Sequence, residues 1–267
     1  MKDYSFASGQ LYYKYEYTKS PPCDAYSMHV HDFYELLYFV NGDATCVIED
    51  RRHKLTAGDL VLIRPLRYHF LQIDSPVDYE RYDMLFDPTR HGIEGVHRIG
   101  AQIEVVHLKE NAIAEDIFRR CEFYRRTCDA ETFSKLLVLL LNELFYNVSM
   151  LPQLSERRGE PLSPLLSEAL QYINAHLTTL RGIEEIAEHL FISEGYLFRI
   201  FRRELRQTPH RYVLDKRLLM AERMIREGER PTEVCRACGF GDYTAFWRNY
   251  RAYFGRSPGE REGAIAK

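Results

Sequence analysis

The chain has 267 residues, of which 45% are hydrophobic and 28% are charged. That length fits two domains of ordinary size, and the composition is typical of a folded globular protein, so an intrinsically disordered chain is excluded. The formal net charge is -3 at pH 7, so the total charge alone gives no indication of a nucleic-acid partner.

The charge is distributed unevenly along the chain. Residues 161–267 contain 17 Lys or Arg and 14 Asp or Glu, a balance of +3, whereas residues 1–160 contain 19 against 25, a balance of -6. An asymmetry of this kind suggests that the two halves have different partners.

Neither a targeting segment nor a membrane helix is predicted. Residues 1–10 are polar and lack the apolar core of a signal peptide, and the longest apolar run, Leu136 to Leu141, is far shorter than the ~20 residues that cross a membrane. We therefore expect a cytoplasmic protein whose six cysteines are reduced. Cys235 and Cys238 have the spacing of a metal or redox pair, but no second pair accompanies them, so we expect two small buried residues on a helix.

Residues 1–107 have the pattern of short β-strands. Met28 to Val40 is rich in Tyr, Phe and Val and ends at Asn41-Gly42, a strong hairpin signal. The Tyr-rich segment 12–17 is expected to form an edge strand, with a mobile arm as the alternative. Turns about every 8–12 residues predict an antiparallel sandwich or barrel. Further strands are expected at 45–49, 59–64, 68–73, 79–86 and 103–108.

The hydrophobic period becomes helical over residues 108–150. Apolar residues recur at helical spacing from Ile113 to Tyr124, and a second helix with a broader apolar surface extends to Val148. That surface is larger than a small domain needs, so we expect part of it to pair two subunits in a homodimer. Residues 151–164 contain three prolines and a glycine, which predicts an interdomain linker.

A helix-turn-helix unit is predicted at residues 183–205. Ala187 on its first helix is small enough to let the next helix cross closely, and Ser193 is placed to cap that next helix. The second helix has an apolar face that includes Leu197 and an opposite face rich in arginine, including Arg199.

The same arrangement recurs about 49 residues later, with Asp242 in the place of Ser193. Gly239 is expected to end the first helix of this second unit. Arg248 follows Phe246 as Arg199 follows Leu197 in the first unit. A long amphipathic helix at 211–225 lies between the two units and can hold their separation.

Two such units suit the geometry of double-stranded DNA. A helix fits the major groove, and two helices held ~34 Å apart can enter successive major grooves on one face of a duplex. Arginine side chains bind phosphates, or contact N7 and O6 of guanine through two hydrogen bonds. The alternative is a helical bundle whose arginines are only solvated, but duplicated caps, cores and arginine positions argue against it.

On these residues, segment 165–262 resembles the DNA-binding domain of the AraC/XylS family of transcriptional regulators. The resemblance rests on Ile186-Ala187, on Ser193-x-x-Tyr196-Leu197-x-Arg199-x-Phe201, on Arg217 and Ala221, and on the run from Cys238-Gly239-Phe240 to Ser257-Pro258. By resemblance, the groove-facing positions of the two recognition helices are Gly195, Tyr196, Phe198, Arg199 and Arg202, then Tyr243, Thr244, Trp247, Arg248 and Arg251.

This chain departs from the family pattern at some groove-facing positions. Gly195 and Phe198 cannot hydrogen-bond bases through their side chains, and Trp247 replaces a smaller polar residue. We therefore expect the first unit to read bases through Arg199 and through apolar contact with thymine methyl groups. Phosphate contacts are expected from Arg202, Arg203 and Arg251.

A group of histidines and one glutamate is predicted in the N-terminal half. His29, His31 and Glu35 alternate along the first strong strand, so they share one face, and His69 follows a later strand. These residues resemble the first and second sequence motifs of cupin barrels, although Arg67 takes the place of a frequent glycine.

Three uses of these residues are open. Three imidazoles and a carboxylate suit a divalent transition metal, with His29, His31, Glu35 and His69 as ligands. A metal-free pocket is the second, in which the same residues bind a small polar effector together with Tyr38 and Arg67. The third is a purely structural role for the histidines.

Taken with the resemblance, these patterns predict an α+β protein of two domains. We expect a cupin-like antiparallel β-barrel that binds an effector (1–107), helices for dimerisation (108–150), a linker (151–164) and an all-α tandem helix-turn-helix domain (165–262). The implied function is that of a sequence-specific regulator that activates or represses transcription. It would bind promoter or operator DNA, act with RNA polymerase and respond to a small molecule such as a sugar or related metabolite.

No enzymatic activity, required cofactor or membrane partner is expected. The alternative function is a metal-dependent cupin enzyme, such as a dioxygenase or isomerase, joined to a DNA-binding module.

Overall fold

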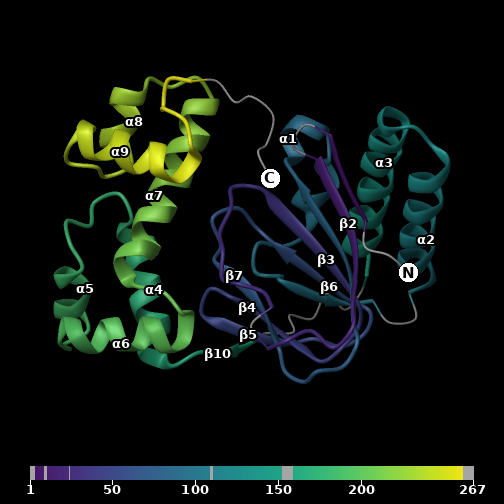
Figure 1. Ribbon diagram of the computed structural model, residues 1–267, viewed down its shortest axis with the longest axis horizontal. Helices are drawn as coiled ribbons and strands as arrows, with labels where there is room; N and C mark the ends of the chain where they lie inside the picture. The colour runs from purple at the N-terminus through teal and green to yellow at the C-terminus, as the bar shows by residue number, and fades with distance from the viewer. Residues whose placement is uncertain (1–3, 9–10, 24, 109–110, 152–158, 261–267) are drawn as a thin grey trace.

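A computed structural model describes the chain apart from residues 1–3, 9–10, 24, 109–110, 152–158 and 261–267. Figure 1 shows a β-sheet domain that carries two long helices and, beside it, a domain made of helices. The predicted class, a two-domain α+β protein with an antiparallel β domain followed by an all-α domain, is therefore confirmed.

The β domain consists of two antiparallel sheets. The larger sheet has the strand order β1-β2-β8-β3-β6-β9, and the smaller has the order β10-β5-β4-β7. No strand ladder joins the two sheets in the described part of the chain, so the predicted barrel is an open pair of facing sheets. The strands are β1 (Tyr4–Ser8), β2 (Leu11–Thr18), β3 (Tyr34–Asn41), β4 (Ala44–Ile48), β5 (Arg51–Lys54), β6 (Asp59–Ile63), β7 (His69–Ile73), β8 (Tyr79–Phe86), β9 (Val105–His107) and β10 (Glu160–Pro161).

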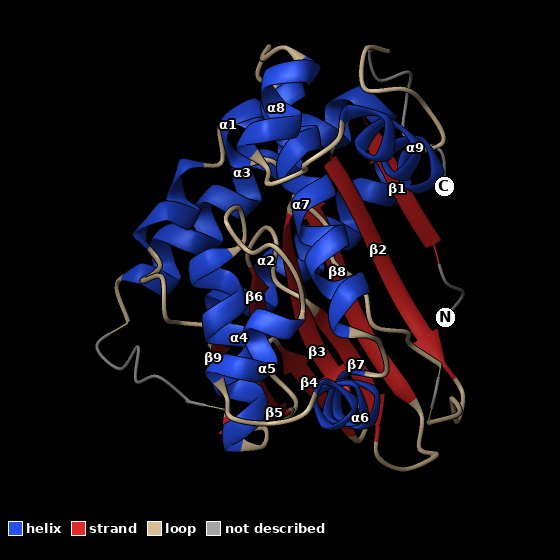
Figure 2. Cartoon of the chain, turned by 90° about the vertical axis from the view of Figure 1, so that its left-hand side faces the viewer, coloured by secondary structure: helices blue, strands red, loops and turns tan. Residues whose placement is uncertain are grey.

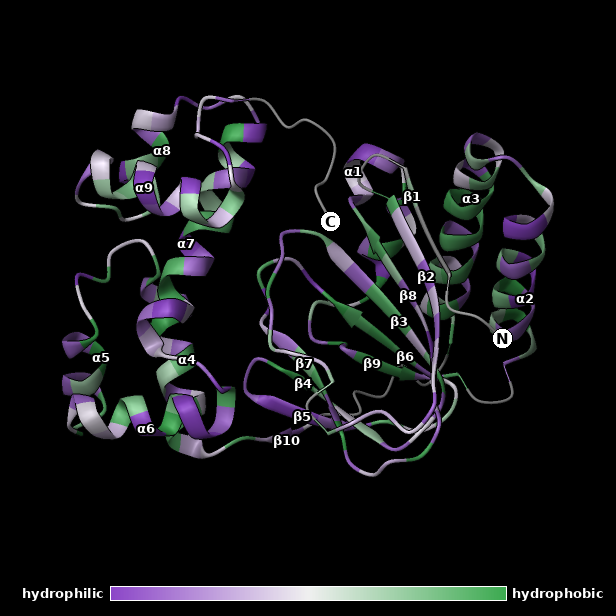
Figure 3. Ribbon diagram, viewed as in Figure 1, coloured by the Kyte–Doolittle hydropathy of each residue, from purple (hydrophilic) through white to green (hydrophobic). Residues whose placement is uncertain are grey.

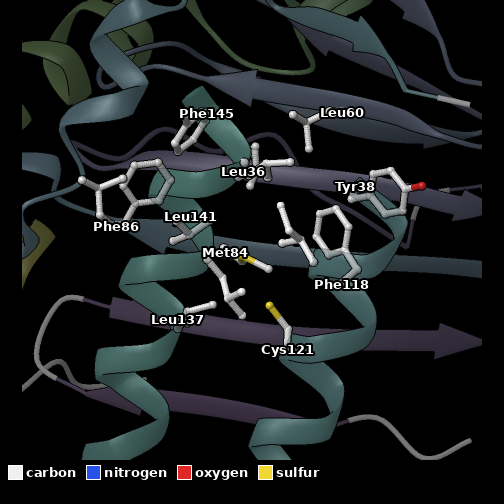
Figure 4. Packing of buried hydrophobic residues seen from close by; sticks show 14 of the residues in the cluster. Leu36, Tyr38, Leu60, Met84, Phe86, Phe118, Cys121, Leu137, Leu141 and Phe145 are labelled. Atoms are coloured by element: carbon white, nitrogen blue, oxygen red, sulfur yellow. The ribbon is translucent and has the colours of Figure 1, made fainter. Parts of the chain in front are cut away.

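The larger sheet is buried on both faces. Leu37 and Phe39 of β3 pack between the sheets, whereas Leu36 and Tyr38 pack on the opposite face against two helices. Figure 4 shows this outer layer, in which Leu36 lies close to Phe145. Because both faces are covered, β3 is a nearly continuous apolar run rather than an alternating one.

The covering helices are α2 (Ala112–Thr127) and α3 (Ala130–Ser149), as the sequence predicted. Asn111 and Asp129 cap them, because their side-chain oxygens accept hydrogen bonds from backbone N–H groups of the first turn. Figure 3 shows how much of α3 is hydrophobic. A short helix α1 (Pro88–His91) and a 3-10 turn (Glu94–Arg98), neither of them predicted from the sequence, lead into β9.

Three expectations for the β domain need correction. The strand expected over 28–40 begins only at Tyr34, and His29 is joined to His69 by an isolated bridge instead. The Tyr-rich segment forms β2 as expected, but β2 is not an edge strand, because β1 pairs with its outer side. The expected linker is partly structured, because Glu160 and Pro161 form β10 against β5; residues 152–158 lie outside the described residues.

The C-terminal domain contains six helices in the described residues. Figures 1 and 2 both show the pair α5 and α6 at one end of α7 and the pair α8 and α9 at its other end. The long central helix therefore separates two helix-turn-helix units, as predicted. The helices are α4 (Pro164–His176), α5 (Glu184–His189), α6 (Glu194–Leu205), α7 (Pro209–Arg226), α8 (Pro231–Ala237) and α9 (Tyr243–Phe254).

The turn of the second unit requires glycine. Gly239 has a φ of +80°, and a Cβ there would lie 2.4 Å from the carbonyl oxygen of Thr178. The equivalent turn of the first unit is made by Phe191, which also has a positive φ of 54° but is 95% exposed. The two turns therefore have similar backbone shapes but different surroundings.

Candidate functional site

Helices α6 and α9 have equivalent caps and equivalent buried residues. Ser193 Oγ accepts from the N–H of Tyr196 at 3.3 Å, and Asp242 Oδ2 accepts from the N–H of Ala245 at 2.7 Å. One turn further on, Leu197 in α6 and Phe246 in α9 are completely buried. The predicted 49-residue repeat is thus a repeat of structure, and corresponding residues of the two helices face corresponding directions.

The opposite faces of α6 and α9 are open to solvent and basic. Arg199, Arg202, Arg248 and Arg251 are all exposed. Arg251 lies over the ring of Trp247, with its guanidinium carbon 5.2 Å from the ring centre. Most of the residues predicted to contact DNA are therefore exposed, whereas Phe198 and Trp247 are half-buried. The exposed residues are Gly195, Tyr196, Arg199, Arg202, Arg203, Tyr243, Thr244, Arg248 and Arg251.

A buried polar network holds α9 against α7. Glu222 of α7 accepts hydrogen bonds from the hydroxyl of Tyr250 and from the guanidinium of Arg256. Arg217 of the same helix donates from Nε to the carbonyl oxygen of Leu177 at 2.8 Å, beyond the end of α4. The central helix is therefore joined by side-chain hydrogen bonds to α9 on one side and to the end of α4 on the other.

The predicted cysteine pair has no metal-binding neighbours among the described residues. Cys235 and Cys238 are buried, and Cys238 Sγ lies 3.6 Å from the sulfur of Met224. Both residues are buried, as expected, but only Cys235 lies within α8, and Cys238 is its C-cap.

The predicted histidines and glutamate do come together in the β domain. One ligand-type atom from each of His29, His31, Glu35 and His69 lies within 4.8 Å of all the others. His31 Nε2 is 2.8 Å and His69 Nε2 is 2.9 Å from the same oxygen, Glu35 Oε2, and His29 Nε2 is 3.9 Å from it. His29, His31 and Glu35 were predicted on one strand and His69 after a later one. In the structure, the segment before β3 and the start of β7 bring the imidazoles to the strand residue Glu35.

The site is largely enclosed. Glu35 and His69 are buried, His31 is half-buried, and the His29 side chain is 52% exposed. Burial lowers the pKa of His29 to about 4. Burial opposes ionisation of Glu35, but His69 and His31 outweigh it and hold the pKa of this carboxyl well below its ordinary value.

A cavity of about 150 Å³ surrounds this group. Two residues expected in it do not line it. Tyr38 lies on the opposite face of β3, where its ring stacks on Phe118 at 4.1 Å, and Arg67 points to Glu104, with NH2 3.0 Å from Oε1. The residues that do line the cavity are Tyr26, His29, His31, Glu35, Leu37, Cys46, Ile63, His69, Phe70, Leu71, Arg81, Asp83 and Leu85.

Two charged residues of the cavity, Arg81 and Asp83, were not predicted from the sequence. Both are buried on β8, where Arg81 lies 3.4 Å from Asp83 and 3.2 Å from Glu16. Burial and the neighbouring Glu35 raise the pKa of Asp83 to about 7. The signal was present in the sequence, because Arg81 and Asp83 alternate along a strand whose other residues, apart from Glu80, are tyrosine or apolar.

The two domains are held together by a buried network centred on Glu49. Glu49 lies in the turn between β4 and β5 and is 2% exposed. It accepts from Lys216 Nζ at 2.8 Å, from the hydroxyl of Tyr212, and from the backbone N–H of Tyr68 at 2.8 Å. Tyr68 also stacks on Tyr212 at 4.4 Å and donates its hydroxyl to Asp215 Oδ2 at 3.0 Å.

Electrostatics favour the ionised form of Glu49. Burial alone would raise its pKa, but Lys216 and Arg67 outweigh this and hold the pKa of Glu49 below its ordinary value. Burial lowers the pKa of Lys216, and the carboxylate of Glu49 counteracts this. A second interdomain ion pair, Arg226 NH2 to Asp32 Oδ2 at 2.7 Å, lies near the other end of α7.

Fold and sites together define a two-domain protein with a small polar cavity in a β domain and, in an α domain, two helices whose exposed faces are basic. Comparison with known families agrees. Residues 15–100 match the model of an AraC-like ligand binding domain, and residues 186–262 match that of a helix-turn-helix domain. The chain belongs to the AraC/XylS family of transcriptional regulators and has an N-terminal sensor domain.

Individual relatives are similar to part or most of this chain. The probable transcriptional regulator LumQ of Photobacterium leiognathi is 32% identical over 39% of this chain and 41% of its own length, so the match spans less than half of that protein. The transcriptional activator RhaS of Escherichia fergusonii is 22% identical over 92% of this chain and 91% of its length. The crystal structure of a transcriptional regulator of the AraC type from Chromobacterium violaceum is 28% identical, covering 36% of this chain and 86% of that chain, with a TM-score of 0.33.

Among the described residues, no helix combines the length and the apolar character that crossing a bilayer demands.

Proposed function

We propose that this protein regulates transcription by placing α6 and α9 in successive major grooves of promoter or operator DNA. The observation that carries the proposal is the pair Arg199 and Arg248. They lie at equivalent positions of two helices with equivalent caps, and both are exposed. A scaffold that presents the same basic face twice matches the repeat of the DNA groove.

The test is selection of duplexes from a random-sequence library by the purified full-length chain. We expect enriched sequences with two short conserved elements separated by about one helical turn, ~10 base pairs. Enrichment of a single element, or no enrichment over the starting library, would overturn the proposal. The selected duplex then serves as the probe for further experiments.

The effector is proposed to bind in the cavity around Glu35. A sugar or related metabolite remains our proposal for its class, because hydroxyl groups can both donate to Glu35 and accept from Arg81. The cavity of about 150 Å³ is smaller than the ~300–1,000 Å³ typical of pockets for drug-sized ligands. The effector is therefore a small compound, and scanning calorimetry of the chain with pentoses, hexoses and short polyols tests its class.

The subunit partner is proposed to be a second copy of this chain. Helices α2 and α3 cover the sheet with one side and expose large apolar residues on the other, including Phe123 at 60% and Leu139 at 64%. Two copies that pair through these helices would present four recognition helices.

RNA polymerase is the proposed partner at the promoter, and the cytoplasm is the proposed location.

Control by an effector requires a ligand that distinguishes two arrangements of the protein. The Glu49 network provides a route, because Tyr68 belongs to it and His69, the next residue, belongs to the cavity. A change in DNA affinity of fivefold to 150-fold corresponds to a coupling of about 1–3 kcal/mol. A partial change in the Glu49–Lys216 ion pair and in the hydrogen bonds around it is sufficient to supply a coupling free energy of this size.

A metal-dependent enzyme remains the second candidate function, and the observation that favours it is the convergence of three imidazoles and Glu35. Outside these residues, the cavity contains Asp83 as the group placed to exchange a proton with a substrate. Turnover of a substrate by the metal-loaded protein would support this function; effector-dependent DNA binding without turnover would reject it.

A further inference from the structure

We propose that a groove between the two helix-turn-helix units binds the sugar–phosphate backbone of the DNA that separates the two occupied major grooves. This interunit groove has a volume of about 320 Å³. It is lined by residues 180–183 between α4 and α5, by four residues in the first half of α7, and by Phe240 and Asn249 of the second unit. The inference adds a third contact to those of α6 and α9, and it rests on the proposed function, because it needs a duplex bound by both helices.

The interunit groove lies on the side of α7 that faces away from the β domain. Tyr212 and Lys216 both contact Glu49 of the β domain, so their side of α7 faces that domain. Leu214, which lines the interunit groove, follows Tyr212 by two residues and therefore lies ~200° further round the helix. Figure 1 shows the β domain on one side of the α domain, so the interunit groove belongs to the other side.

The N-terminal ends of α6 and α9 belong to the same outer side. Arg206, the C-cap of α6, lies over the ring of Phe70 in β7, with its guanidinium carbon 5.7 Å from the ring centre. Residues 258–260, which follow α9, line a cavity together with Arg90 of α1. Since the C-terminal ends of both helices are next to the β domain, their N-terminal ends are the ones further from it.

The interunit groove also adjoins both surfaces that are proposed to contact DNA. At one border, the rings of His210 and Phe198 have their centres 5.4 Å apart, and Phe198 is a predicted groove-facing residue of α6. At the other border, Asn249 follows directly after Arg248 in α9. A duplex that takes α6 and α9 in successive major grooves must pass over the interunit groove with the backbone that separates them.

The charge of the interunit groove suits phosphate groups. Its polar side chains are Arg181, His210, Arg217 and Asn249, and none of the described residues that line it is acidic. Arg217 donates to two backbone carbonyl oxygens beyond the end of α4, and its charge has no carboxylate partner among the described residues. The interunit groove is therefore a positively charged surface made largely of hydrogen-bond donors.

Three of these side chains are available to a ligand. The Arg181 side chain is 89% exposed, and its contact with Glu185 uses only Nε, which leaves its two terminal nitrogens. The side chains of His210 and Asn249 form no hydrogen bond to another described residue. All three can donate to phosphate oxygens, which are the commonest partners of protein side chains on DNA.

The shape of the interunit groove distinguishes a backbone strand from a single phosphate ion. Leu214 and Phe240 are half-buried and form an apolar floor between the donors. A DNA strand alternates charged phosphates with sugars, and both are contacted in protein complexes. Separated donors around an apolar floor match that alternation, whereas one phosphate ion would leave most of the floor uncovered.

The experiment uses the full-length chain and the selected duplex. Single phosphates between its two conserved elements are replaced, one at a time, by uncharged methylphosphonates, and binding is followed by fluorescence anisotropy. We expect at least one replacement to weaken binding by about 2- to 10-fold, the loss of one hydrogen bond. That effect should disappear in Arg181→Gln or in Asn249→Ala, because the partner of the replaced phosphate is then already missing.

Arg181→Gln alone should weaken selected and scrambled duplexes alike and reduce the slope of log affinity against log salt by about 1. Arg223→Gln is the matched control. Arg223 has the same kind of exposed contact, from Nε to Glu227 four residues later at 3.0 Å, but it lines a cavity with residues of the β domain. Removing this arginine should leave the affinity and the salt slope unchanged.

Equal losses in Arg181→Gln and Arg223→Gln would overturn the proposal, because they would reflect net charge alone. Full affinity for every methylphosphonate duplex would also overturn it, as would methylphosphonate effects that persist in both groove variants. In each case, selection of a duplex with two conserved elements would still support the proposed regulator. Failure to select such a duplex would instead reject the regulator, and the backbone contact with it.

Discussion

Lys216 Nζ lies 2.8 Å from Glu49 Oε1, although 167 residues separate the two in the chain. Lys216 belongs to the central helix of the α domain and Glu49 to a turn of the β domain, and both are almost fully buried. A buried ion pair of this kind makes the relative position of the two domains sensitive to either partner. The same contact lies next to Tyr68, and therefore close to the histidine cluster.

Replacing Lys216 by methionine should destabilise the protein by about 3–5 kcal/mol, because it leaves Glu49 as a buried charge without its counter-ion. Urea unfolding at pH 7 measures the loss, and small-angle X-ray scattering of the folded variant should show domain separation. The double variant Glu49→Gln/Lys216→Met should recover part of the stability, since neither charge is then buried alone. Lys135→Met, at an exposed pair with Glu131 on α3, is the control and should change stability by less than about 0.5 kcal/mol.

The contribution of Glu49 should also depend on pH in a defined direction. Its folded-state pKa is lowered, so the stability that its ionisation contributes is fully present above its unfolded pKa of about 4.3 and is lost as pH falls through the folded value. We expect the difference in unfolding free energy between the unmodified chain and Glu49→Gln to stay constant from pH 7 to about pH 5 and to shrink below about pH 4.3. A difference that grows on acidification would contradict the sign of this shift.

The recognition helices could be predicted from the sequence because their determinants are local. Ser193 and Asp242 cap helices directly after them, and buried residues such as Leu197 and Phe246 recur at helical spacing within one element. The strand β8 was also predicted with its observed bounds. In each case, the residues that decide the element lie inside it or beside it.

The domain interface and part of the cavity could not be predicted in this way. From the sequence, Glu49 has the pattern of a surface residue in a turn, and nothing near it in the chain indicates its contact with Lys216 of α7. Tyr38 was misplaced for a different reason. Side chains alternate along β3, so Tyr38, three residues after Glu35, lies on the opposite face. Its position could therefore have been predicted correctly from the sequence alone.

The turn of the second helix-turn-helix unit should tolerate no side chain. Gly239→Ala places a Cβ 2.4 Å from the carbonyl oxygen of Thr178 at a positive φ, so we expect a loss of stability of about 1–3 kcal/mol in thermal or urea unfolding. Gly195→Ala is the matched control. Nothing lies within 4 Å of its added Cβ, and it sits in helix α6, so it should be neutral or stabilising by up to about 1 kcal/mol. Equal effects of both changes would argue against the close contact at Gly239.

Arg199→Ala and Arg248→Ala should each weaken binding of the selected duplex by about 1–3 kcal/mol, a loss of roughly 5- to 150-fold, and should relax the base preference in one half of the site only. Arg199 belongs to α6 and Arg248 to α9, so the relaxed halves must differ between the two variants. Arg119→Ala removes an exposed arginine from α2, on the β domain, and should leave affinity unchanged.

Removing a phosphate-contacting arginine should have a different signature. Arg202→Ala and Arg251→Ala are expected to weaken all duplexes to a similar extent and to reduce the slope of log affinity against log salt by about 1. Arg203 should contribute less than Arg202, because its guanidinium already lies 2.6 Å from the carboxylate of Glu204. Fluorescence anisotropy of a labelled duplex over a range of NaCl concentrations distinguishes arginines that contact phosphates from arginines that contact bases. A variant at Arg199 or Arg248 that weakened selected and scrambled duplexes equally would assign that residue to the phosphate backbone rather than to the bases.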